Sequence, residues 1–383
     1  MSLFLISFLL IYGSFNLYFF LKIRAAHSPP GWVLLLLALF LLLMIAAPIL
    51  VRIAERSGYD RLAIVLAYIG YSWMGVVFLF AAAALAVDCY RILIWTAGFL
   101  MRTKMLYQLS AKTTFYLPLV FALCASAWGA FEAWDIRLEK VTLSSAKIPA
   151  AMNGLRIVQI SDVHLGLIVR HKRLAMILAA VKEARPDILV STGDLVDGQI
   201  NNLEGLAEML QEIKPRYGKY AVTGNHEFYA GLQESLAFTE KAGFAVLRNT
   251  GATLKEGFNI AGVDDPASRY FAQQEPPSEQ HMLQSLDQKN FTLLLKHRPV
   301  ADKLSLGLFD LQLSGHTHKG QIFPFNIVTM LYFPIHWGCL NPVDHCYLYV
   351  SRGSGTWGPP IRFLSPPEVT LIELKSENKM IKI

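Results

Sequence analysis

Long apolar stretches dominate the first third of the chain, and shorter apolar runs separated by polar segments follow. Four of the long stretches carry no charged residue, and each has close to the roughly 20 residues that an α-helix needs to cross a bilayer. They cover residues 2–21, 31–51, 62–87 and 113–131. The pattern predicts a transmembrane region of four helices, which we bound at residues 1–134.

A fifth apolar run, residues 92–101, lies between Arg91 and Arg102. It is too short to cross a bilayer, so we expect it to lie along the membrane surface. The four longer stretches lack the ionisable side chains that pumps and transporters place within the membrane. Their composition favours an anchoring role over a conducting one.

From about residue 135 the apolar runs become short and rich in β-branched residues, as buried strands are. After an alternating run at residues 136–143, five strand candidates follow at residues 155–161, 187–192, 219–223, 291–296 and 310–314. Segments with helical spacing lie between the earlier strands, at residues 170–184, 202–214 and 231–243. The alternation predicts an α/β domain over residues 135–383, and the C-terminal runs HCYLYVSRG and PEVTLIEL add strands as a second sheet would.

Each of the five later strand candidates ends in side chains that bind metals. In chain order the clusters are DVH, GDLVD, GNHE, HRP and GHTH. Sites in α/β domains form where strand ends converge, so we expect the clusters to meet. Singly, each has a simpler explanation: Asp197 could cap a helix, Asn225 could occupy a tight turn, and His297 could be a structural histidine.

Composition and charge narrow the class of protein. The chain has 383 residues, of which 54% are hydrophobic, a share too high for a purely soluble protein. The net charge of +6 arises before residue 151, where 12 Lys and Arg face 6 Asp and Glu, whereas the remainder holds 23 of each. Nucleic-acid binding needs a basic surface, so the neutral second part argues against a nuclease, and we expect no nucleic-acid partner.

The basic residues of the membrane region predict its orientation. Six Lys and Arg lie in the segments after the first and third spans, and three lie after the second span. Short loops with more basic residues tend to stay in the cytoplasm. We therefore expect a multi-pass protein of a bacterial inner (plasma) membrane, with its α/β domain outside the cytoplasm. In such a compartment Cys339 and Cys346 could form a disulfide, although two free thiols fit the sequence equally well.

Taken together, the five clusters resemble the motif set of the calcineurin-like metallophosphoesterase superfamily: D-x-H, G-D-x-x-D, G-N-H-E, a lone His and G-H-x-H. The segments GLRIVQISDVHLG, GVDDP, GHTHKGQ and YVSRGSGTWGPPIRFLSPPEVTLIEL look like its membrane-associated, YkuE-like branch. The resemblance covers essentially the whole second part of the chain. It implies an α/β sandwich of two mixed sheets flanked by helices, placed after the four-helix transmembrane region.

The resemblance also implies a site with two divalent metal ions, for which Mn, Fe or Zn suit the donor types. The ligands of the first ion would be Asp162, His164 and His318. Those of the second would be Asn225, His297 and His316. Asp194 would bridge both ions, so that the two histidines of GHTH serve different metals.

In the family mechanism a hydroxide bridging the metals attacks phosphorus, and His226 would protonate the leaving group as a general acid. The alternative for His226 is a purely supporting role behind the ligands. Asp197 and Glu227 would orient ligands by hydrogen bonds without binding metal. Glycines at 193, 224 and 315 would let the backbone turn tightly beside the ligands.

Two cations depart from the pattern expected of the branch. Lys319 replaces the second glycine of GHTHGGQ, and Arg298 follows the lone histidine where a neutral or acidic residue is usual. Both could bind a phosphate of the substrate. The alternative is that both are solvated surface cations.

These observations lead to three functional hypotheses. The first is a membrane-anchored, two-metal phosphoesterase that hydrolyses a phosphate ester or pyrophosphate of a lipid-linked substrate at the bilayer. The second is a UDP-2,3-diacylglucosamine pyrophosphatase of lipid A synthesis, which would act at the cytoplasmic face and so conflicts with the predicted orientation. The third, a non-catalytic membrane sensor or scaffold, should have lost ligands, whereas all seven are present here beside His226.

Overall fold

The computed structural model describes residues 2–102, 109–198, 203–271, 278–343 and 346–377, and the chain forms two compact units. The first, which we call the helical unit, comprises Met1–Phe131 and Gly358–Phe363. The second, which we call the α/β unit, comprises Glu132–Trp357 and Leu364–Ile383. The chain therefore crosses between the units three times.

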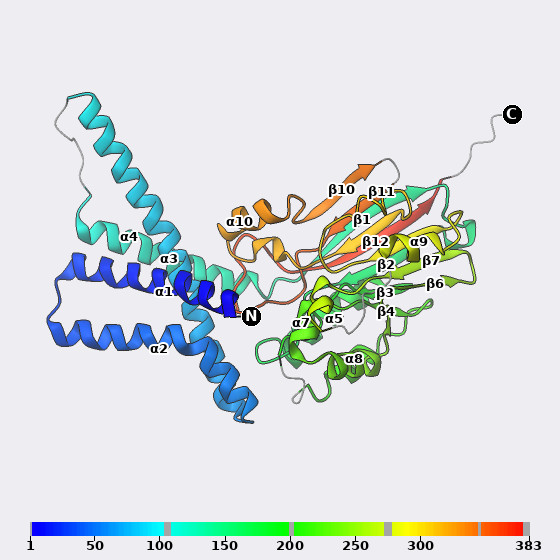
Figure 1. Cartoon of the computed structure of the whole chain (residues 1–383), viewed down its shortest axis with the longest axis horizontal. Coiled ribbons are helices and arrows are strands. Elements are labelled where there is room, and N and C mark those ends of the chain that lie inside the picture. The colour runs from blue at the N-terminus through cyan, green and yellow to red at the C-terminus, as the bar shows by residue number, and fades with distance from the viewer. Residues whose placement is uncertain (1, 103–108, 199–202, 272–277, 344–345, 378–383) are drawn as a thin grey trace. The chain divides into compact units, whose positions relative to one another are not determined.

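The helical unit is built on four long helices (Figure 1), which are α1 (Ser2–His27), α2 (Gly31–Arg56), α3 (Asp60–Leu100) and α4 (Ala111–Glu132). Each is long and apolar enough to cross a membrane. Each also extends beyond the uncharged stretch from which it was predicted. The extra turns carry the charged residues that end the uncharged stretches, and most of these are Lys, Arg or Glu, which are good helix formers.

Helix α3 differs most from the sequence-based expectation. Residues 92–101 do not start a separate element, because α3 runs unbroken through them to Leu100 over 41 residues. At 1.5 Å per residue this helix is about 60 Å long, twice the apolar thickness of a bilayer. The polar residues that interrupt its apolar pattern are paired: Asp88 lies 2.7 Å from Lys22 Nζ and 3.4 Å from Arg91.

The short segment Gly358–Phe363 belongs to the helical unit although it lies late in the sequence. The Arg362 backbone N–H donates to the Gly129 carbonyl of α4 at 2.9 Å. A Cβ at Gly75 of α3 would lie 2.7 Å from the Ile361 side chain, and one at Gly129 would lie 2.9 Å from the Arg362 carbonyl oxygen. The two glycines thus leave the space in which the segment packs, whereas the sequence pattern predicts that it belongs to the α/β domain.

The α/β unit contains two mixed six-stranded sheets, as the resemblance implied (Figure 1). The first sheet has the order β1 (Arg137–Ser145), β12 (Glu368–Ser376), β2 (Leu155–Ile160), β3 (Ile188–Ser191), β4 (Lys219–Ala221), β5 (Ala245–Val246). The second has the order β10 (Gly338–Val343), β11 (Cys346–Val350), β9 (Leu311–Ser314), β8 (Phe291–Leu295), β7 (Phe258–Gly262), β6 (Thr250–Leu254). Strands β2 to β5 run parallel to one another, and so do β7, β8, β9 and β11.

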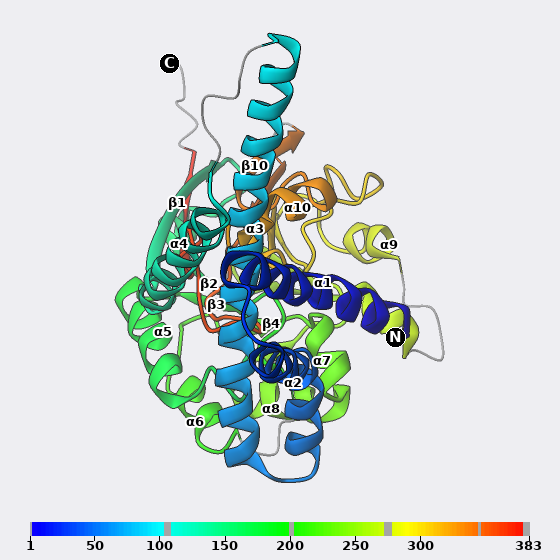
Figure 2. The ribbon, with the colours of Figure 1, turned by 90° about the vertical axis from the view of Figure 1, so that its left-hand side faces the viewer.

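The main core lies between the two sheets. Ile157 and Val190 of the first sheet pack there with Ile260, Leu293 and Leu313 of the second. A second core fills the space between the first sheet and the helices α5 (His171–Ala184), α6 (Leu206–Gln211) and α8 (Leu232–Lys241). Figure 2 shows α5 and α6 from another side. Because the central strands are buried on both faces, they read as continuous apolar runs instead of alternating ones.

Shorter elements complete the α/β unit. They are the α-helices α7 (Asn225–Ala230), α9 (Glu279–Gln284) and α10 (Phe325–Tyr332) and the 3₁₀ turns η1 (Ala150–Met152), η2 (Pro266–Tyr270) and η3 (His318–Gly320). Cys339 and Cys346 lie on the adjacent strands β10 and β11, and both are free thiols. The disulfide that the sequence left open is therefore not formed.

Candidate metal centre

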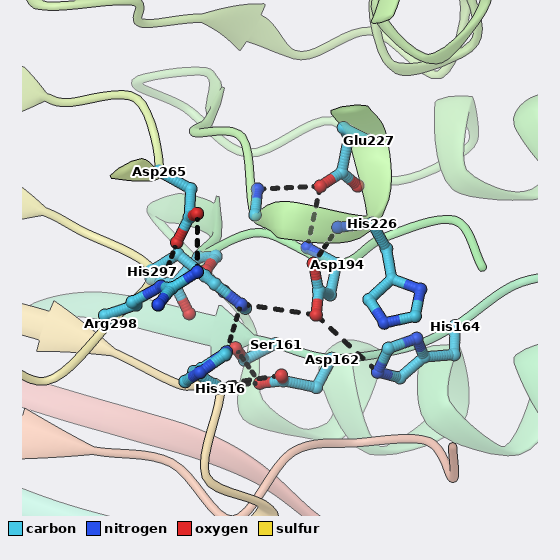
Figure 3. Close-up of polar contacts among 12 residues, drawn as sticks. Ser161, Asp162, His164, Asp194, His226, Glu227, Asp265, His297, Arg298 and His316 are labelled. Atoms are coloured by element: carbon cyan, nitrogen blue, oxygen red, sulfur yellow. Dashed lines mark hydrogen bonds and ion pairs between the residues drawn. The ribbon is translucent and has the colours of Figure 1, made fainter. Parts of the chain in front are cut away.

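The five polar clusters predicted from the sequence all directly follow strands. Three come after β2, β3 and β4 of the first sheet, and two come after β8 and β9 of the second. Within each sheet these strands are parallel, so their carboxyl ends lie at one edge. The side chains from both edges meet in one buried cluster (Figure 3).

The backbone at this cluster is strained. Five candidate ligands have left-handed φ angles, a region that costs a non-glycine residue about 1–2 kcal/mol. They are Asp162 (50°), His164 (53°), Asp194 (51°), His316 (71°) and His318 (48°). Such strain persists where the surrounding fold enforces it, and it gathers at functional sites.

The three glycines of the motifs serve two different purposes. Gly193 has a φ of +93°, so it provides the expected tight turn. Gly224, with φ −98°, and Gly315 are required for close approach instead. A Cβ at Gly224 would overlap the Asp194 carboxylate, and one at Gly315 would overlap Asp162 and the Ser161 hydroxyl. The explanation from turning alone was wrong for these two positions.

The first group of candidate ligands consists of Asp162, His164 and His318, all buried. His318 Nε2 lies 3.4 Å from Asp162 Oδ1 and 3.1 Å from His164 Nε2. The Ser161 hydroxyl donates to Asp162 Oδ2 at 2.5 Å, and the His316 backbone N–H donates to both carboxylate oxygens at 3.0 Å. The carboxylate is thereby fixed with its oxygens near two converging imidazole nitrogens.

The second group consists of Asp194, His297 and His316. His297 Nε2 lies 3.2 Å from Asp194 Oδ2 and 3.1 Å from His316 Nδ1. The other ring nitrogen, Nδ1 of His297, donates to the Thr192 carbonyl at 2.8 Å. That bond directs Nε2 into the cluster, where its lone pair can bind a metal once the proton there is lost.

Asp194 connects the two groups. Its Oδ2 atom lies 3.2 Å from His297 Nε2 and 3.8 Å from His164 Nε2, so it stands between a histidine of each group (Figure 3). Its Oδ1 atom accepts from the His226 backbone N–H at 2.9 Å. A carboxylate in this place is suited to bridge two cations.

Asn225, the first residue of α7, gives an independent indication of a cation. Its side-chain oxygen Oδ1 is buried and has no hydrogen-bond partner among the residues that the structure describes. Leaving such an oxygen unpaired costs about 1–3 kcal/mol, and a metal ion would remove that cost. The amide oxygen, imidazole nitrogens and carboxylates together form the donor set of a borderline divalent ion such as Mn, Fe or Zn.

The charges of the cluster are strongly interdependent. Burial alone would raise the pKa of Asp194, but His297 and His226 outweigh it and hold that pKa well below its usual range. Burial opposes the charged form of His297, but Asp194 prevails and raises the pKa of His297 to about 10. Burial and the nearby His297 lower the pKa of His316 to about 3. Among these side chains, an ionised Asp194 is therefore paired with a protonated His297 beside a neutral His316.

His226 stands next to the ligands with its ring held by Asp197. Its Nδ1 lies 2.9 Å from Asp197 Oδ1, and its ring meets that of His164 edge-on at 4.7 Å between centroids. Burial lowers the pKa of His226, but Asp194 and Asp197 outweigh it and raise the pKa to about 9. The exposed rings of Tyr229 and Trp357 each lie 5.7 Å from the imidazole of His226.

Glu227 fixes the backbone that carries the ligands. Its Oε2 atom accepts from the N–H groups of Gly224 (2.7 Å) and Asp194 (3.0 Å). Its Oε1 atom accepts from those of Leu195 (2.7 Å) and Val196 (3.3 Å). The carboxylate thereby ties the start of α7 to the loop after β3.

The two unusual cations are not freely solvated. Arg298 forms two hydrogen bonds to the buried carboxylate of Asp265, from Nε at 2.7 Å and from Nη2 at 3.1 Å. Lys319 places its ammonium 4.1 Å from the centre of the Trp337 ring, and burial lowers the pKa of Lys319. Both side chains are partly buried against these partners, and phosphate binding by them stays a prediction.

Several residues of the site were not singled out from the sequence. Asp265 lies in the GVDDP segment just after β7, a strand end that matches the five recognised ones. Ser354 and Gly355 donate their N–H groups to the carbonyls of Ser161 and Asp162, at 2.7 and 3.0 Å. Trp357 follows in the same loop, so the YVSRGSGTW segment holds the DVH loop in place.

Comparison with known proteins agrees with this arrangement. The family model described as calcineurin-like phosphoesterase matches residues 155–320. A metallophosphoesterase of Aquifex aeolicus is 40% identical over 257 residues, which cover 67% of this chain and 98% of that protein. The metallophosphoesterase YkuE of Bacillus subtilis is 33% identical over 248 residues, covering 62% of this chain and 85% of its own length.

A third relative is described as a transmembrane protein. The transmembrane protein with metallophosphoesterase domain of Danio rerio is 35% identical over 246 residues. These residues cover 61% of this chain and 56% of the fish protein. The shared part is therefore shorter than that relative.

Proposed function

Because this chain belongs to the calcineurin-like metallophosphoesterases and is a metal-dependent phosphoesterase, we propose that it hydrolyses a phosphate ester or pyrophosphate of a lipid-linked substrate. The observation that supports the site most directly is the place of Asp194 between His297 and His164. A single carboxylate that faces both ligand groups is what a pair of neighbouring cations requires.

The proposed ligands follow the two groups. Asp162, His164 and His318 would hold one ion, and Asn225, His297 and His316 would hold the other, with Asp194 shared by both. Bound divalent ions supply Lewis acidity toward phosphoryl oxygens and bring the pKa of water close to neutral. Asp197 and Glu227 keep the surrounding rings and backbone in place without binding metal.

His226 acts in this proposal as the general acid. Its Nδ1 atom is engaged by Asp197, so Nε2 carries the proton that can move to the departing oxygen. The contact with Asp197 favours the protonated form of His226, and in the protein without metal Asp194 and Asp197 raise the pKa of His226 to about 9. The negative charge of Asp197 stabilises the protonated ring of His226 until the proton moves to the leaving group.

Two observations support a lipid-linked substrate. The helical unit contains four helices apolar enough to cross a membrane, and lipids are the most concentrated phosphate esters in a bilayer. The rings beside His226 are exposed, Tyr229 by 61% and Trp357 by 48% of their surface, and they offer apolar contact to a leaving group. A lipid phosphate that is cleaved at the headgroup fits both features.

The test uses the full chain purified in detergent and loaded with Mn. Phosphate release is measured with a monoester, a diester and lipid pyrophosphates, including UDP-2,3-diacylglucosamine. Asp194→Asn should lose at least about 1,000-fold in kcat/KM, since it removes the shared ligand, whereas the exposed Asp287→Asn should match the parent. Equal turnover by Asp194→Asn and the parent would contradict the proposed site. If Asp194→Asn lost its activity in vitro but still performed the protein's role in cells, the result would favour a scaffold.

The orientation is a separate proposal. The excess of Lys and Arg after the first and third spans supports a plasma-membrane protein whose α/β unit lies outside the cytoplasm. A C-terminal fusion to an enzyme that is active only outside the cytoplasm should be active. If that fusion were inactive, and a C-terminal fusion to an enzyme active only in the cytoplasm were active, the α/β unit would lie inside the cell. That result would favour the pyrophosphatase of lipid A synthesis.

A further inference from the structure

The segment after the GHTH motif forms an apolar surface that the proposed chemistry does not use. Residues 320–343 contain no Asp, Glu, Lys or Arg. Within them lies α10, whose eight residues are all described and none of which is buried. Its last two side chains are the most exposed, Leu331 by 76% and Tyr332 by 79%. Phe323, Trp337 and Leu340 extend the exposed apolar surface on both sides of the helix.

Such a surface is not explained by the folding of the α/β unit itself. A helix at the surface of a soluble domain usually buries one apolar stripe and presents charge on the other side. Helix α10 instead exposes Phe325, Ile327, Val328 and Met330 on all sides. Contiguous exposed apolar surface of this kind marks contact with a partner or a membrane.

Helix α10 is also joined rigidly to the candidate metal centre. Phe333, directly after α10, packs edge-on against the His316 ring at 5.3 Å. The Thr317 hydroxyl donates to the His336 carbonyl at 2.6 Å. A Cβ at Gly320 would overlap the backbone of Asn326, so the first turn of α10 rests directly on η3, which contains His318. Figures 1 and 2 both show α10 beside β10 of the second sheet.

We propose that α10 and its flanking residues Phe323, Trp337 and Leu340 insert into the interfacial layer of the bilayer that the helical unit occupies. The occupant is a lipid surface because the α/β unit belongs to the same chain as four helices apolar enough to cross a membrane, and three chain crossings connect it to them. The mixture of aliphatic side chains with Trp, Tyr and Phe is typical of elements that lie at the level of the lipid headgroups. Lys319, held against the Trp337 ring, adds a cation at the edge where lipid phosphates lie.

The consequence concerns substrate access. With α10 in the interface, the centre that contains His316 and His318 lies at the depth of the headgroup phosphates. A lipid phosphate then reaches the site without leaving the bilayer. This consequence rests on the proposed function, whereas insertion of α10 does not.

The test places a fluorophore on α10 of the full chain in lipid nanodiscs. The four natural cysteines are replaced by Ser or Ala, and Leu331→Cys is labelled with an environment-sensitive dye. The matched control is Lys255→Cys, in the exposed polar turn between β6 and β7. Lipids that carry a nitroxide on the acyl chain should quench the dye at position 331 several-fold more than the dye at 255. Equal, weak quenching at both positions would overturn the proposal.

Other occupants give different results. If a second copy of the chain covered α10, Leu331→Cys would form disulfide-linked dimers and the dye would escape quenching by the lipid, which would also overturn the proposal. Because neither Val328 nor Leu331 is buried, the double variant Val328→Glu with Leu331→Glu should fold normally. It should lose roughly tenfold in kcat/KM for a phospholipid in vesicles and retain the parent's turnover of p-nitrophenyl phosphate.

The two proposals can fail separately. Strong quenching at position 331, together with no turnover of any ester, would support the insertion of α10 and reject the proposed function. Normal turnover of lipid phosphates with no quenching would reject the helix alone. An equal loss on both substrates in the double variant would assign α10 a structural role and contradict the proposed route of access.

Discussion

At the scale of single residues, the site depends on groups that are unfavourable without a cation. Asp194, with a left-handed backbone, faces a protonated His297, and the buried Asn225 oxygen has no hydrogen-bond partner among the described residues. The sequence identified these residues because each one follows a strand in a recognisable motif. It could not show the strain or the unpaired oxygen, since both depend on how segments from two sheets approach each other.

The role of His226 can be tested through the leaving group. Replacing His226 with Ala should lower kcat about 100- to 1,000-fold for an alkyl phosphate, whose departing oxygen needs a proton. The loss should be much smaller for p-nitrophenyl phosphate, because p-nitrophenolate departs readily without one. Steady-state kinetics on both esters measure the difference. An equal loss on the two substrates would show that His226 only supports the ligands.

Metal binding should depend on pH through His297. Its pKa of about 10 in the metal-free protein means that Nε2 holds a proton at neutral pH, and a metal ion must displace it. Affinity should therefore fall as pH falls from 10 toward neutrality, with roughly one proton released per chain from this residue. Calorimetric titration at pH 7 in two buffers of different ionisation enthalpy measures the release. Identical heats in both buffers would contradict the predicted protonation of His297.

At the scale of elements, the loops after the strands are held by contacts that lie far apart in the sequence. Glu227 joins α7 to the loop after β3, and Ser354 with Gly355 joins the loop after β11 to that after β2. The strands themselves were predictable, because burial on both faces makes each a continuous apolar run. The element α10 was not anticipated, since its short apolar pattern does not distinguish an exposed helix from a buried segment.

Glu227 provides a test of this positioning. Glu227→Gln would place an amide donor among four backbone N–H groups, so metal affinity should fall about 10- to 100-fold although no ligand is removed. The free energy of unfolding should fall by about 1–3 kcal/mol. The matched control is Glu234→Gln on the exposed side of α8, which should behave as the parent. Metal titrations and denaturant unfolding measure both effects, and parent-like affinity in Glu227→Gln would contradict the role.

At the scale of the whole molecule, the chain combines helices apolar enough to cross a membrane with an α/β unit whose positive and negative charges nearly balance. Hydrophobic patterning alone predicted the four helices and the change from long apolar stretches to short strand-like runs near residue 135. It did not predict that Gly358–Phe363 returns to the helical unit. That segment has the composition of a loop. The space in which it packs exists because Gly75 and Gly129, on two helices far apart in the sequence, lack side chains.

The central claim is a pair of divalent ions that share Asp194, and the metal content of active protein tests it most directly. Elemental analysis of the full chain, taken together with turnover as metal is removed by a chelator and restored, should give two ions per chain at full activity. Asp194→Asn should bind fewer ions and stay inactive after metal is restored. Full turnover by protein that holds no divalent ion, or two tightly held ions in Asp194→Asn, would contradict the account.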